Sequence, residues 1–137
     1  MEQAWKFFSS PHNLTLITPP DMDFHIKSRN LPEEIHDGVM IEYRVRPVMR
    51  IPAKWISEIT NVLPPFKFTD RQISGPYRLW EHEHTLEETE NGVMVTDEIR
   101  YALPFGFLGV IAHNLFVKKR LQSIFEYRRK ALKKMFG

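Results

Sequence analysis

The chain has 137 residues, a formal net charge of +2 and no cysteine, and its 42% hydrophobic and 26% charged residues are ordinary for a globular protein. This length supports one domain with a real core, and the missing cysteine excludes disulfides, thiolate catalysis and cysteine-bearing zinc sites. Because the N-terminus lacks a signal-peptide core and no apolar run approaches the ~20 residues of a membrane span, we expect a single cytoplasmic domain over residues 1–137.

Two short helical segments are predicted at the N-terminus. Residues 1–10 carry Trp5 and Phe8 three positions apart, which is the spacing of one helix face. A second helical turn is predicted over residues 11–16, where Pro11 occupies the first helical position. Two prolines after Thr18 end this turn.

Six strands are predicted next, because apolar and polar side chains alternate and turn residues separate most of the runs. The strands are expected over residues 24–29, 39–48, 52–63, 66–74, 77–89 and 92–103. Consecutive strands joined by short turns pair antiparallel, so we expect a meander. In the fourth strand, the alternation predicts that Phe66, Phe68, Asp70 and Gln72 face inward.

The last two strands place polar side chains on their apolar faces. His82 and His84 share a face with Trp80, and Asp97 shares a face with Tyr101. Unpaired polar groups cost roughly 2–7 kcal/mol when they are buried, whereas a binding cavity uses a few placed polar groups. This pattern therefore indicates a sheet that holds a ligand.

The period of the apolar residues changes from two to 3.6 after Pro104 and Gly106, which predicts a helix from about residue 107 to 136. Such a helix is about 45 Å long, and it must pack along a broad, curved sheet to bury its apolar stripe. We therefore expect an α+β fold in which the inward polar side chains point into a space between sheet and helix.

Several short motifs occur together along the chain. They are Trp5-Lys6-Phe7-Phe8, Pro64-Pro65-Phe66, Asp70-Arg71-Gln72, Gly75-Pro76-Tyr77, Trp80-Glu81-His82-Glu83-His84, Pro104-Phe105-Gly106 and Ile124-Phe125-Glu126-Tyr127-Arg128. In this combination the chain resembles the SRPBCC (START and birch-pollen-allergen-like) superfamily, and more narrowly its small bacterial cyclase/dehydrase-like ligand-binding group. The resemblance implies a helix-grip fold, in which a curved antiparallel sheet of about six strands wraps around a long C-terminal helix. It also implies a hydrophobic cavity for lipids, sterols, polyketides or other apolar molecules.

One feature departs from that family. Its members usually begin with a β-strand, whereas here Met1 falls almost directly on the first short helix. If the usual first strand is missing, one edge of the sheet is exposed, and an exposed edge is a template for pairing with another chain. We therefore hypothesise that the chain forms a homodimer, or pairs with another partner, across that edge.

We expect a small apolar ligand in the cavity, with no cofactor, no metal and no assigned catalytic residue. The residues predicted to line the cavity are Tyr43, Trp55, Phe68, Gln72, Trp80, His82, His84, Asp97, Tyr101 and Leu115. For the histidines and Asp97, a hydrogen-bonded polar corner is favoured over direct ligand contact and over a zinc or iron site. For Asp70 and Gln72, pairing with the backbone near the Gly75-Pro76 turn is an equal alternative.

An enzymatic alternative uses the same residues. A His–Asp pair tunes a proton acceptor near neutral pH, and cyclases related to this family close and dehydrate polyketides in such cavities. A second alternative is an interaction module that uses the exposed sheet edge or the last helix.

The last helix carries a run of basic residues: Lys118, Lys119, Arg120, Arg128, Arg129, Lys130, Lys133 and Lys134. A solvated face is the favoured interpretation, because helices normally turn charge outward. The functional alternative is attraction to an anionic membrane, at about 1 kcal/mol per basic residue. No nucleic-acid partner is expected, because the run lacks interleaved aromatic residues and a known binding motif.

Overall fold

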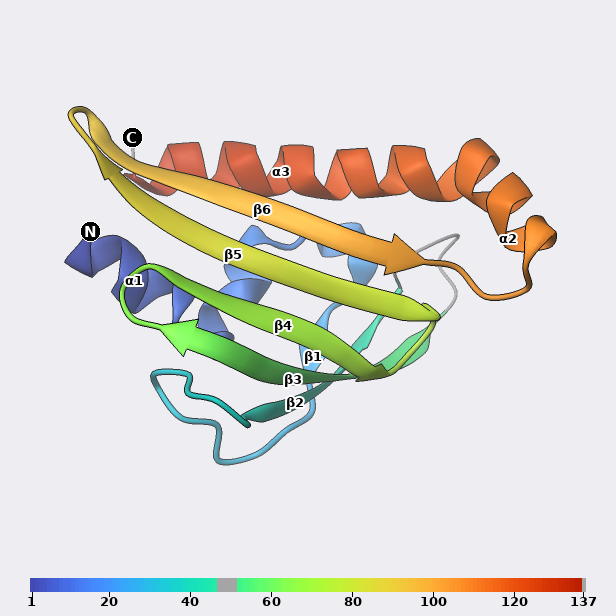
Figure 1. Ribbon diagram of the computed structural model, residues 1–137, viewed down its shortest axis with the longest axis horizontal. Helices are drawn as coiled ribbons and strands as arrows, with labels where there is room; N and C mark the ends of the chain where they lie inside the picture. The colour runs from blue at the N-terminus through green and yellow to red at the C-terminus, as the bar shows by residue number, and fades with distance from the viewer. Residues whose placement is uncertain (47–51, 137) are drawn as a thin grey trace.

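The architecture consists of a curved antiparallel sheet with helices on one side of it (Figure 1). The computed structural model describes residues 1–46 and 52–136. Within these residues the elements are α1 (Glu2–Phe8), the 3₁₀ helices η1 (Pro11–Ile17) and η2 (Pro20–Met22), β1 (His25–Ile26), β2 (Met40–Val45), β3 (Ala53–Leu63), β4 (Lys67–Ser74), β5 (Leu79–Thr89), β6 (Gly92–Ala102), α2 (Phe107–Ala112), the π-helical η3 (His113–Val117) and α3 (Lys118–Phe136).

The strands pair in the order in which they occur, from β1 to β6, and every pair is antiparallel. Figure 1 shows α3 running along the length of β5 and β6. The fold is therefore α+β with a helix-grip-like arrangement, as predicted. Among the described residues, no helix is both long enough and apolar enough to cross a membrane.

The alternation of side chains in the long strands is confirmed. In β5, Trp80, His82, His84 and Leu86 are buried, at 8%, 6%, 4% and 1% exposure. Aromatic residues of β3, β5 and the β4–β5 turn pack against Val117 and the first turns of α3. This packing fixes the position of the helix over the sheet, because an isolated helix gains most of its stability from burying its apolar face.

Two strand predictions need correction. The first strand is His25–Ile26 rather than residues 24–29: Asp23 adopts a left-handed conformation before it, and after it the N–H groups of Lys27 and Ser28 both donate to the Glu42 carbonyl, which breaks the regular ladder. Phe66 is 52% exposed rather than inward, because it lies in the turn before β4, where its N–H donates to the Leu63 carbonyl. Residues 47 and 48 of the second predicted strand lie outside the described residues.

The predicted helix over residues 107–136 is divided by the π-helical η3. Leu108 and Leu115 belong to its predicted apolar stripe, but they are 59% and 58% exposed. Figure 1 shows that α2, which carries Leu108, projects beyond the ends of β5 and β6, so the sheet does not extend under this helix. Among the residues of this segment whose burial the structure describes, Val117 is the first buried one, at 4% exposure, and it packs in the core formed by β3 and β5.

The sheet has two edges, β1 and β6. The strand β1 has only two residues, whereas β6 has eleven. Pairing with a second copy across an exposed edge stays a prediction.

Candidate functional site: a buried His–Asp–Arg network

Five polar side chains meet beneath α3, and we call them the polar cluster: Asp70, His82, His84, Asp97 and Arg128. The strand register brings four of them together. Asp70 of β4 lies opposite His82 of β5, and His84 of β5 lies opposite Asp97 of β6. Because side chains two apart share a face, all four point toward the helix, from which Arg128 reaches down.

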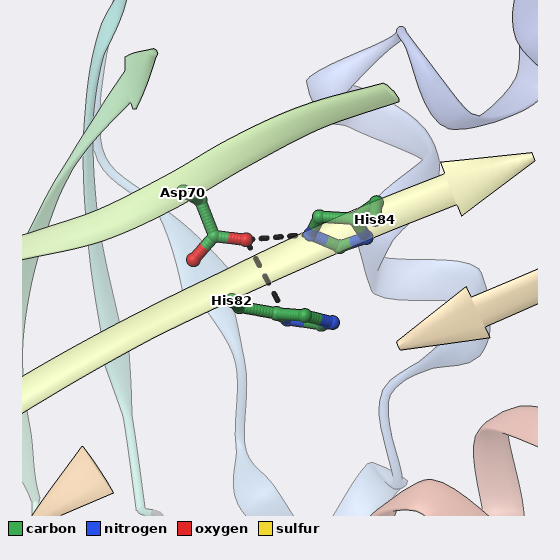
Figure 2. Close-up of side chains that lie close together, drawn as sticks. All are labelled: Asp70, His82 and His84. Atoms are coloured by element: carbon green, nitrogen blue, oxygen red, sulfur yellow. Dashed lines mark hydrogen bonds and ion pairs between the residues drawn. The ribbon is translucent and has the colours of Figure 1, made fainter. Parts of the chain in front are cut away.

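Each histidine of the cluster is held by a carboxylate. Nε2 of His82 donates to Oδ1 of Asp97 over 2.8 Å, and Nε2 of His84 donates to Oδ2 of Asp70 over 2.7 Å. Figure 2 shows the second of these bonds, together with the 3.6 Å approach of His82 Nδ1 to the same Asp70 oxygen. The aspartates therefore fix the orientation of both rings.

Arg128 completes the network from the opposite side. Its Nε and Nη2 donate to the two carboxylate oxygens of Asp97, each over 3.0 Å, which is the bidentate geometry that makes arginine–carboxylate pairs strong. The side chain of Arg128 is 6% exposed, so this is a buried ion pair. Arg128 was predicted on the solvated basic face of the last helix, and that prediction is wrong.

The contact between Arg128 and His84 determines the protonation of that ring. Nη2 of Arg128 lies 3.3 Å from Nδ1 of His84. A guanidinium can only donate, so Nδ1 accepts, and the proton of a neutral ring stays on Nε2, facing Asp70. Burial, together with the neighbouring His82 ring, lowers the pKa of His84 to about 4, although the hydrogen bond to Asp70 opposes that shift.

Both aspartates of the cluster are ionised near neutral pH. Burial alone would raise the pKa of Asp97, but the hydrogen bond from His82 and the charge of Arg128 outweigh it and hold that pKa well below its usual range. The pKa of Asp70 is lowered in the same way, against the effect of burial, first by the hydrogen bond from His84. Two carboxylates therefore face one fixed cation, Arg128.

A metal site formed by His82, His84 and Asp97 was the alternative interpretation of the sequence. In the structure, the carboxylate that lies with the two histidines in a group able to hold a metal ion is that of Asp70. Ligand atoms of Asp70, His82 and His84 lie within 4.8 Å of one another (Figure 2). However, the two imidazole rings stack, with centroids 3.7 Å apart and planes 26° from parallel. An ion about 2.1 Å from a nitrogen of each ring would lie well out of the plane of at least one of them. In addition, Nδ1 of His84 accepts a hydrogen bond from Arg128. A metal bound at Nε2 of a neutral His84 ring would put the ring proton on Nδ1, which could then no longer accept from Arg128.

This geometry favours a hydrogen-bonded network over a metal centre. We therefore expect that adding Zn²⁺ or Co²⁺ leaves the melting temperature of the protein unchanged, as measured by differential scanning fluorimetry. A rise in melting temperature that His82→Gln abolishes would contradict this expectation, because it would show that the rings rotate to ligate the ion.

Two apolar cavities adjoin the polar cluster. The α1-side cavity, of about 70 Å³, lies against Phe7 and Phe8, and the α3-side cavity, of about 120 Å³, lies against Leu121, Ile124 and Phe125. Six residues line both cavities: Leu14, Ile17, Tyr43, Asp70, His84 and Arg128. The cluster thus forms part of a polar wall that the two apolar spaces share.

Several predicted site residues line these cavities. Phe68 lines the α1-side cavity, Trp55, Trp80 and His82 line the α3-side cavity, and Tyr43 and His84 line both. The Tyr43 hydroxyl lies 3.4 Å from Oγ of Ser57. Burial, and then the charge of Asp70, raises the pKa of Tyr43 well above its ordinary value, so this hydroxyl remains a neutral donor.

Four predicted residues line neither cavity. Gln72 instead holds the β4–β5 turn, because its Nε2 donates to the Tyr77 carbonyl over 2.6 Å and its Oε1 accepts from the Tyr77 N–H over 3.1 Å. Asp97 lies behind the histidines, bound to Arg128, and Tyr101 packs edge-on against Tyr77. Leu115, on η3, is 58% exposed.

The residue that sequence reasoning missed is Arg128, although a signal for it exists. Leu121, Ile124, Phe125 and Arg128 are spaced i, i+3, i+4 and i+7, and Leu132 continues the series. Arg128 therefore occupies a position of the apolar stripe. A charged residue in a stripe is a candidate for a buried ion pair, because charges are rarely buried unpaired.

Comparisons with known proteins support the fold and nothing more specific. No family model matches this sequence, and no curated protein matches it. A solved crystal structure, that of TTHA0849 from Thermus thermophilus, is similar in three dimensions, with a TM-score of 0.62 and 17% sequence identity. The similarity covers 94% of this chain and 86% of that chain.

Proposed function

We propose that the protein binds a small apolar or amphipathic molecule between its sheet and its C-terminal helix, and that it is a member of the SRPBCC superfamily. The observation that carries this proposal is the pair of apolar cavities that share Asp70, His84 and Arg128 of the polar cluster in their lining. A buried polar network beside apolar space is the usual composition of a ligand pocket. The lack of cysteine supports a reducing compartment such as the cytoplasm.

The size of the cavities limits the ligand. A cavity of roughly 150 Å³ lined by aliphatic and aromatic side chains accommodates benzene, and the α3-side cavity has about 120 Å³. The α3-side cavity is slightly smaller than that, so the proposed ligand is no larger than one ring or a short chain. A lipid, sterol or polyketide requires the two cavities to join through movement of their shared lining.

The polar cluster favours a ligand that donates hydrogen bonds. An ionised carboxylate offers about four acceptor sites, and His84 uses one of those on Asp70. Because Asp70 lines both cavities, its remaining acceptor capacity suits a hydroxyl or amine on the ligand. Apolar burial, at about 25 cal/mol per Å², would supply most of the affinity, and the polar group would set the orientation.

An enzymatic function is the second candidate, and one contact favours it. The 2.8 Å bond from His82 to Asp97 orients this imidazole, which lines the α3-side cavity, and its Nδ1 lies 3.6 Å from Oδ2 of Asp70. A carboxylate that orients an imidazole in this way prepares it for general base chemistry. A cyclase or dehydratase reaction is the corresponding proposal, and turnover lost in His82→Gln would test it.

The experiment that tests the main proposal is native mass spectrometry of the freshly purified protein, followed by solvent extraction and identification of any released molecule. A co-purifying small apolar molecule, present in stoichiometric amount, supports ligand carriage. A protein that is empty, and that binds no member of a library of one-ring alcohols and amines, contradicts it.

Filling the α3-side cavity is expected to block this binding. Ile124 lines the cavity from α3, so Ile124→Phe adds volume where space exists and should lower ligand affinity more than about tenfold while leaving stability near that of the wild type. The matched control is Leu132→Phe, a partly buried position on the same helix. Calorimetry with the extracted ligand measures both variants, and equal affinities would remove this cavity from the binding site.

A further inference from the structure

The segment between β6 and α3 exposes an unusual number of large apolar side chains. We call these residues the apolar tip: Phe105, Leu108, Val110, Ile111, Leu115 and Phe116, which are 81%, 59%, 59%, 48%, 58% and 49% exposed. Figure 1 shows that α2 projects from one end of the molecule, beyond the strands. Scattered exposed apolar residues are ordinary, but a contiguous patch of them marks an interaction site.

The apolar side chains surround the tip rather than forming one face. Leu108 and Val110 are two positions apart on α2, which places them about 200° apart around the helix axis, and both are 59% exposed. A helix that is apolar on all sides belongs in an apolar medium. A flat surface of a partner protein would cover only one side of such a tip, whereas the apolar part of a lipid bilayer would surround it on all sides.

The charges along this stretch of the chain have one sign, and the acidic residue recorded beside it, Asp21 of η2, is paired with Arg120. No aspartate or glutamate occurs between Glu98 and Glu126, whereas Lys118 and Lys119 follow η3 directly. Both lysines are exposed. Basic side chains next to an inserted apolar segment lie at the level of lipid headgroups, where anionic lipids attract them.

We propose that the apolar tip inserts into the surface of an anionic lipid bilayer, with Lys118 and Lys119 at the headgroups. The insertion is peripheral, since it uses only the end of the molecule. It also brings the α3-side cavity close to the membrane, because Leu121, one turn beyond Val117, lines that cavity. The docking itself is independent of what the cavity binds.

Co-sedimentation with vesicles tests this proposal. The wild-type protein is expected to bind vesicles of phosphatidylcholine and phosphatidylserine at low ionic strength, and to bind pure phosphatidylcholine vesicles at least about tenfold more weakly. The double variant Leu108→Glu/Ile111→Glu should lose at least about tenfold in affinity for the anionic vesicles. Its matched control is Leu16→Glu/Met94→Glu, which places the same charges at side chains that are 55% and 56% exposed elsewhere.

The lysines have a control on the same helix. Lys118→Glu/Lys119→Glu should weaken binding to the anionic vesicles more than Lys133→Glu/Lys134→Glu does, since the second pair lies at the far end of α3. Circular dichroism confirms that each variant is folded. The proposal is overturned if the wild type stays in the supernatant, if it binds neutral vesicles equally well, or if the tip variant binds like its control.

A second copy of the chain is the other occupant that the tip could accept. Light scattering without vesicles distinguishes it. A wild-type dimer that becomes monomeric in Leu108→Glu/Ile111→Glu would overturn membrane docking in favour of self-association, whereas a wild-type monomer that binds anionic vesicles supports the bilayer.

Discussion

Replacing Arg128 with methionine is expected to lower the free energy of unfolding by about 3–5 kcal/mol, because removing one partner of a buried ion pair leaves the other charge uncompensated. The remaining partner is Asp97, which accepts two hydrogen bonds from Arg128. The side chain of Asp97 is 19% exposed, so little water is available to replace the guanidinium. Methionine is unbranched and replaces the apolar stem of the arginine without its guanidinium, so most of the loss is electrostatic. Urea denaturation measures it.

The neighbouring residue provides a matched control. Arg129 pairs with Glu126 on the exposed face of α3, so Arg129→Met should cost less than about 0.5 kcal/mol. The double variant Arg128→Met/Asp97→Asn tests the cause. A neutral amide no longer needs the guanidinium, and it still accepts from His82, so the double variant should recover at least about 1 kcal/mol relative to the sum of the single changes. Additive effects of the two substitutions would show that the ion pair is not the origin of the loss.

The inward face of β5 was predictable because it depends on a local rule. Side chains two apart share a face of a strand, and the run that contains Trp80, His82 and His84 continues without a glycine or proline to interrupt it. The order of the strands was predictable for a similar reason, since short turns join neighbours that pair antiparallel. Both features are properties of consecutive residues and need no knowledge of distant ones.

The contacts within the site depend on distant residues and were less accessible. The register places Asp97 opposite His84, yet its carboxylate bonds to His82, because side chains lean along the strand in a direction that the sequence does not specify. The pairing of Asp97 with Arg128 joins residues 31 positions apart. The one sequence signal for this ion pair was that Arg128 occupies a position of the apolar stripe. The rule that helices turn charged residues outward argued against the pair.

The position at which the C-terminal helical segment begins to pack against the sheet was not predictable from the sequence either. The apolar residues of the last segment continue back to Leu108, so the periodic pattern alone extends the buried helix to that residue. Among the side chains of this segment whose burial the structure describes, burial begins at Val117, and Figure 1 shows α2 beyond the ends of β5 and β6. That boundary is set by the length of the sheet, which lies elsewhere in the sequence, and the apolar residues beyond it become the exposed tip.

Acidification from pH 7 to pH 4 is expected to destabilise the protein by on the order of 3 kcal/mol through His84 alone. The pKa of His84 falls from 6.5 to about 4 on folding, first because the ring is buried and then because His82 lies against it. Between these two pH values only the unfolded chain binds a proton at His84, so each step down in pH favours unfolding. The contribution is fully present above pH 6.5 and is lost as the pH falls toward 4.

A second loss follows at lower pH and has the same sign. Asp70 and Asp97 have lowered pKa values in the folded protein, so their contribution is present above the ordinary aspartate pKa of about 3.9 and disappears as the pH falls below it. His84→Gln separates the two effects, because its amide can still donate to Asp70 but cannot titrate. Urea denaturation at several pH values should show that this variant loses the slope between pH 6.5 and 4 and retains the slope below it. His36→Gln, at an exposed ring, is the control and should keep both. If the stability of His84→Gln depends on pH between 6.5 and 4 as strongly as that of the wild type, another group causes the pH dependence. The conclusion that His84 is neutral beside Arg128 would then be contradicted.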